Sequence, residues 1–139
     1  MQRIVWTDDF SLGIEHLDAQ HRQLIDLINR TSEKLESGGE ELEALPLLRE
    51  LQQYARSHFE AEEAYMTELE FPEEPEHIKQ HQYFISRIME MDARLFNQED
   101  GILLELGEFL NFWLIDHIVM NDFKYASFAG TRTKPVLMT

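Results

Sequence analysis

Two stretches of the sequence pair a histidine with a second metal-binding residue four positions later. His58 is followed by Glu62, and His77 is followed by His81. A helix brings residues four apart onto one face, so each pair would present two donor groups side by side. Imidazole and carboxylate groups are common metal ligands in proteins. We therefore expect the two pairs to face each other as half of a metal cage.

Apolar residues recurring at steps of three and four predict four helices that would carry these donors. The predicted helices run from about Asp18 to Ser37, from shortly before Pro46, which lies in the first turns, to Leu69, from about Pro75 to Asn97, and from about Leu103 to residue 128. Asp18 is placed to cap the first helix, and Gly38 and Gly39 follow its end. Four amphipathic helices joined by short loops favour an all-α, antiparallel up-down-up-down bundle.

One domain would then span residues 1–139. We expect an irregular arm over residues 1–17, packed down by Trp6 and Phe10, and a tail over residues 129–139. The size and the 43% hydrophobic content suit one compact core. We expect this domain to be a monomer.

The composition excludes several classes of partner and site. A formal charge of -15 repels phosphate backbones and anionic lipid heads, so we expect neither nucleic-acid nor membrane-surface partners. Because the chain has no cysteine, it can form no thiolate zinc site and no iron–sulfur cluster. The N-terminus lacks the apolar stretch of a secretion signal, and no run approaches the roughly 18 apolar residues of a membrane span. These features predict a soluble cytoplasmic protein.

Most of the histidines fall where apolar residues belong. Five of the six lie in the inner stripe of a predicted helix, namely His21, His58, His77, His81 and His117. A buried polar group without a partner costs about 1 to 3 kcal/mol, so five of them would nearly exhaust the stability of a small domain. A shared metal site would satisfy all of them, together with Glu62. Glu60 and Glu63 lie off this face and are interpreted as solvated, as is His16 before the first helix.

Asp122 reaches the same site only if the fourth helix is locally widened. On a regular helix, a residue five positions after His117 points about 140° away from it. A π-bulge between the two residues would correct this, and such bulges are frequent at functional sites. We therefore include Asp122 among the candidate ligands.

The number of candidate ligands indicates two metal ions. Five imidazoles and two carboxylates exceed what one tetrahedral or octahedral ion can use. With both carboxylates and one oxygen atom shared between two ions, three histidines fill one ion and two histidines leave the other with an open position. Nitrogen and oxygen donors without sulfur suit iron, although manganese, zinc or cobalt could occupy the site in a preparation.

The stretches that carry these ligands resemble the hemerythrin family, in particular its single-domain bacterial members, from Trp6 to about Phe128. They are Ile14 to Leu27, His58 to Glu63, His77 with His81, and His117 with Asp122. His16 stands where the family more often carries another residue type, which puts no ligand in doubt. The resemblance implies a non-haem di-iron centre, bridged by an oxo or hydroxo group, that binds dioxygen reversibly. It also implies that His77, His81 and His117 hold the six-coordinate iron, that His21 and His58 hold the five-coordinate iron, and that Glu62 and Asp122 bridge them.

Apolar residues beside the candidate ligands favour binding of a small neutral gas over catalysis. An apolar wall would exclude water from the open position, and we expect it to consist of Leu24, Phe59, Trp113, Leu114 and Ile118. No inner-face acid or base remains to serve a substrate, so we predict a protein for oxygen storage, delivery or sensing that is not an enzyme. An oxygen-consuming protein would be its possible recipient.

Three other functions stay open at this point. A di-iron enzyme could activate dioxygen or remove peroxide, although such enzymes resemble ferritin-like bundles richer in carboxylates. A freestanding sensor of oxygen or nitric oxide could signal through a separate protein. A plain four-helix scaffold would carry no metal and fold equally well without it.

Overall fold

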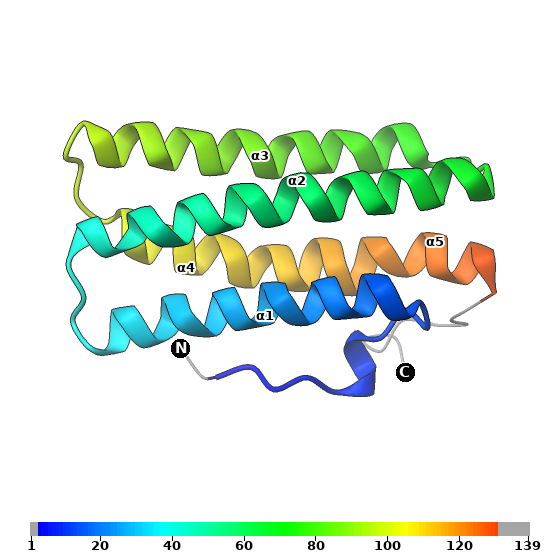
Figure 1. The fold of residues 1–139 in the computed structure, drawn as a ribbon, viewed down its shortest axis with the longest axis horizontal. Helices are drawn as coiled ribbons and strands as arrows, with labels where there is room; N and C mark the ends of the chain where they lie inside the picture. Colours follow the sequence, from blue (N-terminus) through cyan, green and yellow to red (C-terminus); the bar gives the residue numbers. More distant parts are fainter. Residues whose placement is uncertain (1–2, 131–139) are drawn as a thin grey trace.

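Four long helical stretches run side by side and antiparallel in the computed structural model, which describes residues 3–130 (Figure 1). The first three are α1 (Glu15–Glu36), α2 (Ala44–Leu69) and α3 (Glu74–Phe96). The fourth is a continuous succession of α4 (Ile102–Trp113), the π-helical segment η3 (Leu114–Asn121) and α5 (Asp122–Ala129). Short 3-10 turns occupy η1 (Asp8–Phe10) and η2 (Glu41–Glu43). No strand occurs within residues 3–130, so the predicted all-α bundle is confirmed.

The helix ends follow from local residue chemistry. After α1 the chain turns at Gly38, whose φ of 72° is a left-handed conformation that a residue without a Cβ adopts at little cost. The N–H groups of Gly38 and Gly39 donate to the carbonyl oxygens of Leu35 and Lys34 at the end of the helix. The predicted end of the first helix is therefore confirmed. Of the predicted tail, everything from residue 131 onward lies outside the described residues.

The predicted start of the first helix at Asp18 was wrong. The helix begins three residues earlier, at Glu15, and the residue at its N-cap, Ile14, makes no side-chain cap. The carboxylate of Asp18 instead accepts hydrogen bonds from the hydroxyl of Ser11 at 2.5 Å and from the N–H of Leu12 at 2.8 Å. Asp18 thus ties down the arm that precedes its helix.

The arm itself is fixed along α1. The side-chain amide of Asn29 both donates to and accepts from the backbone of Ile4, at 2.7 and 2.8 Å. Trp6 and Phe10 are partly buried against the core, as predicted.

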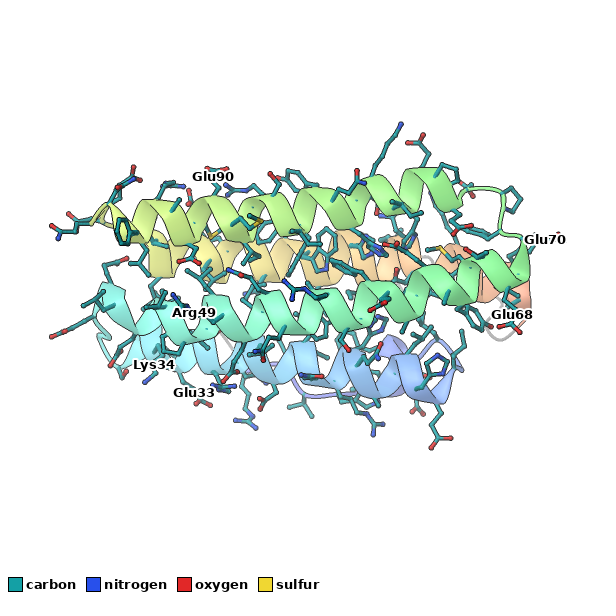
Figure 2. All side chains as sticks on the ribbon, turned by 45° about the horizontal axis from the view of Figure 1, so that its top comes forward. Glu33, Lys34, Arg49, Glu68, Glu70 and Glu90 are labelled. Carbon is teal, nitrogen blue, oxygen red and sulfur yellow. The ribbon has the colours of Figure 1, made fainter. Side chains whose placement is uncertain are left out.

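The interior consists of two apolar clusters with a polar cluster between them. The larger apolar cluster extends from Leu24 on α1 to Ile118 on η3, and the smaller one groups residues such as Leu17, Met66 and Tyr125. The candidate ligands lie along the helices between these two groups. The charged side chains labelled in Figure 2, including Glu33, Glu68 and Glu90, project from the outside of the bundle. Within residues 3–130, no helix has both the length and the apolar character needed to cross a lipid bilayer.

Candidate metal centre

All seven candidate ligands meet in one buried cluster. Each of the four helical stretches contributes at least one of them, and each is at most 4% exposed. Their donor atoms form two groups, in each of which every donor atom lies within 4.8 Å of the others. The first group consists of Glu62, His77, His81 and His117, and the second of His21, His58, Glu62 and Asp122. The three histidines of the first group and the two of the second are the sets that the family resemblance implies.

The two carboxylates lie between the groups. Oε1 of Glu62 is 3.1 Å from Nε2 of His81 and 3.3 Å from Nε2 of His58. Its Oε2 is 3.8 Å from Nε2 of His21. Glu62 therefore approaches histidines of both groups. Asp122, on the fourth helical stretch, also approaches histidines of both groups.

The two carboxylate oxygens of Asp122 lie close to three imidazole nitrogens. Its Oδ1 is 2.8 Å from Nε2 of His77 and 3.2 Å from Nε2 of His117, and its Oδ2 is 3.1 Å from Nε2 of His21. The π-helical segment η3 makes the approach to His117 possible, since it adds about one residue per turn between the two side chains. The predicted widening of the fourth helix is therefore confirmed.

The donor atoms lack the hydrogen bonds that buried polar atoms need. Despite the short distances, none of these approaches has hydrogen-bond geometry. The buried atoms without a hydrogen-bond partner include Nε2 of His21, His58, His77, His81 and His117, Oε1 of Glu62, and both oxygens of Asp122. Such atoms cost about 1 to 3 kcal/mol each when unsatisfied. Metal cations at the centre of each group would satisfy them, so the residues fit a metal site.

Charges inside the cluster shift the pKa values of its members when no cation is bound. Burial lowers the pKa of His21, but the carboxylates of Asp122 and Glu62 outweigh this effect and raise it to about 9. Burial opposes ionisation of Glu62, yet the neighbouring histidines, His58 first, hold its pKa well below the usual range. Burial lowers the pKa of His117. The two buried carboxylates thus favour positive charge inside the cluster, which a bound cation would also supply.

Three histidines are oriented by side chains that sequence reasoning missed. Nδ1 of His58 lies 2.5 Å from Oε1 of Gln20, Nδ1 of His81 lies 2.8 Å from Oε2 of Glu63, and Nδ1 of His117 lies 2.6 Å from Oε1 of Gln80. These oxygens can only accept, so Nδ1 of each ring carries the proton and Nε2 of each ring points into the cluster.

The interpretation of Glu63 as a solvated residue was wrong, because its carboxylate binds His81. Glu60 and His16 are exposed, as predicted. One signal was available in the sequence: Gln20, Glu63 and Gln80 each lie directly beside a candidate ligand.

The predicted apolar wall is buried in the larger core cluster. All five of its members, Leu24, Phe59, Trp113, Leu114 and Ile118, are at most 3% exposed. Phe59 stacks on His81 with ring centroids 3.9 Å apart, and Trp113 stacks on His117 at 4.1 Å. Two of the aromatic residues therefore cover the three-histidine group.

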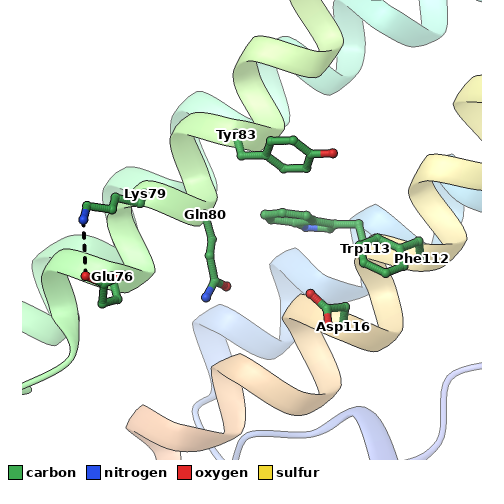
Figure 3. A pocket seen from close by; sticks show the side chains of 7 residues that line it. All are labelled: Glu76, Lys79, Gln80, Tyr83, Phe112, Trp113 and Asp116. Carbon is green, nitrogen blue, oxygen red and sulfur yellow. Dashed lines mark hydrogen bonds and ion pairs between the residues drawn. The ribbon is translucent and has the colours of Figure 1, made fainter.

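A hollow of about 230 Å³ opens on the surface next to this group (Figure 3). Its lining consists of Glu76, Lys79, Gln80, Tyr83, Phe112, Trp113 and Asp116. Gln80 and Trp113 both contact His117, so a single layer of side chains separates the hollow from the cluster.

A buried set of imidazole and carboxylate groups within an antiparallel four-helix bundle places the protein in the class of metal-binding helical bundles. Residues 12–129 match the family model described as the hemerythrin HHE cation binding domain. The chain belongs to the hemerythrin family.

Individual relatives agree with this assignment. The chain is 36% identical over 131 residues to a bacteriohemerythrin of Stenotrophomonas maltophilia, a match that covers 91% of this chain and 81% of the relative. It is 31% identical over 121 residues to the myohemerythrin of Riftia pachyptila, covering 87% and 89%. The fold is similar to a crystal structure of a hemerythrin with a leucine-to-alanine mutation, with a TM-score of 0.81, 22% identity, and coverage of 92% and 98%.

Proposed function

We propose that this protein binds dioxygen reversibly at a pair of non-haem iron ions. One ion would be held by His77, His81 and His117, and the other by His21 and His58, with Glu62 and Asp122 bridging them. The observation that carries this proposal is that Glu62 and Asp122 each approach buried, unsatisfied imidazole nitrogens of both groups. When bound, the two ions would supply the electrons and the open position that dioxygen needs.

The choice of iron rests on the donors and on the family. Imidazole and carboxylate donors without sulfur suit iron, and the relatives are named as hemerythrins. The donor set has seven members, which is more than one ion can use, and supports a count of two.

The surrounding side chains would keep the site dry and correctly oriented. The ligands are almost fully buried, so solvent water has little access to the position that dioxygen would occupy. The hydrogen bonds from Nδ1 of His58, His81 and His117 hold three rings with Nε2 directed inward. A dry, rigid site would favour the release of unchanged dioxygen, because protons from water would otherwise release the reduced dioxygen as hydrogen peroxide and leave the iron oxidised.

The residues near the cluster support binding rather than catalysis. Outside the seven candidate ligands, the buried titratable groups of residues 3–130 are Tyr54 and Tyr125. Burial, with the carboxylates of Glu62 and Asp122, raises the pKa of both phenols well above the usual value. Neither phenol would release a proton near neutral pH, so neither is suited to act as a general acid toward a substrate.

An oxygen electrode tests this function directly. The iron-free chain is loaded anaerobically with two equivalents of ferrous iron and then exposed to a known amount of dioxygen. We expect uptake of one dioxygen per two iron ions and its return to solution when the oxygen pressure is lowered. Continued consumption of oxygen in the presence of a reductant would instead establish an oxidase or another oxygen-activating enzyme, and a chain that retains no iron would refute the proposal.

A further inference from the structure

The three hydrogen bonds at histidine Nδ1 atoms follow one repeated pattern around the bundle. Gln20 on α1 accepts from His58 on α2, Glu63 on α2 accepts from His81 on α3, and Gln80 on α3 accepts from His117 on η3. Each accepting side chain thus comes from the helix that precedes its histidine, and each lies beside a candidate ligand in the sequence. Through this pattern, α1, α2 and α3 each orient a candidate ligand on the next helical stretch.

Glu63 differs from the other two accepting residues, because its side chain is a carboxylate and those of Gln20 and Gln80 are neutral amides. Its side chain is 34% exposed and its Oε2 lies 2.8 Å from Nδ1 of His81. On the other side of the same ring, Oε1 of Glu62 lies 3.1 Å from Nε2. His81 is therefore held between carboxylates of two successive residues of α2.

A carboxylate at Nδ1 changes the ring more than an amide does. A charged acceptor draws the Nδ1 proton more strongly and leaves more electron density on Nε2, which makes the imidazole a better metal ligand. The amides of Gln20 and Gln80 orient their rings with a weaker effect of this kind. Gln80 is itself fixed, since its Nε2 donates to Oδ1 of Asn121 at 3.4 Å.

We infer that Glu63 is a positioning residue that makes His81 a stronger metal ligand than His58 or His117, and so tightens the three-histidine site. This inference rests on the proposed function, because it requires that the cluster binds metal. It assigns the two metal positions unequal donor strength through a residue that is not itself a ligand.

Substitution of Glu63 by glutamine separates charge from shape. Glu63→Gln keeps an oxygen that can accept from His81 and removes the negative charge, whereas Glu63→Ala removes both. Glu60→Gln is the matched control, because Glu60 is exposed on the same helix and its loss changes the net charge by the same amount. Gln80→Glu is the reciprocal variant, since it places a carboxylate at His117.

Cobalt(II) titration of the iron-free chain, followed by visible absorption, measures metal affinity without any oxygen chemistry. We expect the parent chain and Glu60→Gln to bind two ions with the same affinities. Glu63→Gln should lower the affinity for one of the two ions by about 10-fold, and Glu63→Ala should lower it by up to about 100-fold. Gln80→Glu should tighten one ion.

A second readout follows the hydrogen bond itself. In the zinc-loaded chain, the Nδ1 proton of His81 should resonate further downfield than those of His58 and His117. Glu63→Gln should move it toward them, and Glu60→Gln should leave it in place.

Failure of the proposed function and failure of the role of Glu63 would give different results. If the parent chain binds no cobalt, both the proposed function and this inference are refuted. If it binds two ions and Glu63→Gln matches Glu60→Gln in affinity and in the His81 proton, only the role of Glu63 is refuted.

Discussion

The hydroxyl of Tyr125 donates a hydrogen bond to Oε2 of Glu62, at a distance of 2.5 Å, and both side chains are fully buried. The two residues come from the second and fourth helical stretches. This bond leaves Oε1 of Glu62 directed at His58 and His81. Tyr125 therefore fixes the orientation of a carboxylate that we propose as a bridge between two metal ions.

Removal of this hydroxyl should weaken the fold and the site. Tyr125→Phe leaves Oε2 of Glu62 without its donor, so we expect the free energy of unfolding of the metal-free chain to fall by about 1 to 3 kcal/mol. Urea denaturation measures this change, and cobalt titration measures the accompanying loss of affinity. Tyr65→Phe is the control, since Tyr65 is a partly buried tyrosine on the rim of the same apolar cluster. Equal effects of the two substitutions would contradict the role of Tyr125.

Loss of a ligand should lower the metal content. Glu62→Ala and His58→Ala each remove a donor from the cluster, so we expect fewer than two iron ions per chain and a less stable iron-loaded protein. His16→Ala should retain two ions, because His16 is exposed and lies outside the cluster. Metal analysis after gel filtration gives the count. Full occupancy in both ligand variants would remove the ligand assignment.

The metal-free chain should lose stability as the pH rises above about 6.5. The pKa of His21 is raised from 6.5 to about 9 in the folded state, mainly by carboxylates that overcome the opposing effect of burial. A raised pKa stabilises the fold below the unfolded value and loses that contribution as pH passes through the folded value. The shift corresponds to a loss on the order of 3 kcal/mol between pH 6.5 and 9.

Urea denaturation in the presence of a chelator, across this pH range, checks the dependence. His21→Gln should reduce the dependence of stability on pH, because glutamine does not titrate. The iron-loaded chain should behave in the opposite way, since ligation requires neutral imidazole and releases protons. A flat profile for the metal-free parent chain would contradict the charge arrangement at His21.

Leu114 should protect the site from water. It is 3% exposed at the start of η3, three residues before His117. Leu114→Ala should speed autoxidation of the oxygen-loaded protein by admitting water, and should cost about 2 to 5 kcal/mol of stability as a core truncation. Leu110→Ala is matched for burial and residue type and lies one turn further from the cluster. If both variants lose colour at the same rate, Leu114 does not gate the pocket.

The sequence was informative where the helical period of 3.6 residues determines which face of a helix a side chain occupies. It placed five histidines and Glu62 on inner faces, and those side chains are buried together. It also required a π-bulge between His117 and Asp122, because five residues is the wrong spacing for one face of an α-helix, and η3 is π-helical.

Contacts between elements could not be predicted in the same way. Asp18 has the composition of a helix cap, but nothing in its own helix shows that its carboxylate binds Ser11 and Leu12 of the arm. Glu63 lies about 100° from Glu62 around α2, so periodicity placed it outside the cluster. Its long side chain reaches across to His81 on the neighbouring helix, a distance that depends on how the helices pack.

Visible absorption through one oxygenation cycle tests the central claim most directly. The iron-free chain is loaded with two equivalents of ferrous iron under nitrogen, and spectra are recorded before oxygen, after oxygen, and after oxygen is swept away. We predict a colour that develops with oxygen and fades on its removal, with iron held at two per chain throughout. A colour that persists while peroxide is released, or while a co-substrate is consumed, would contradict reversible binding.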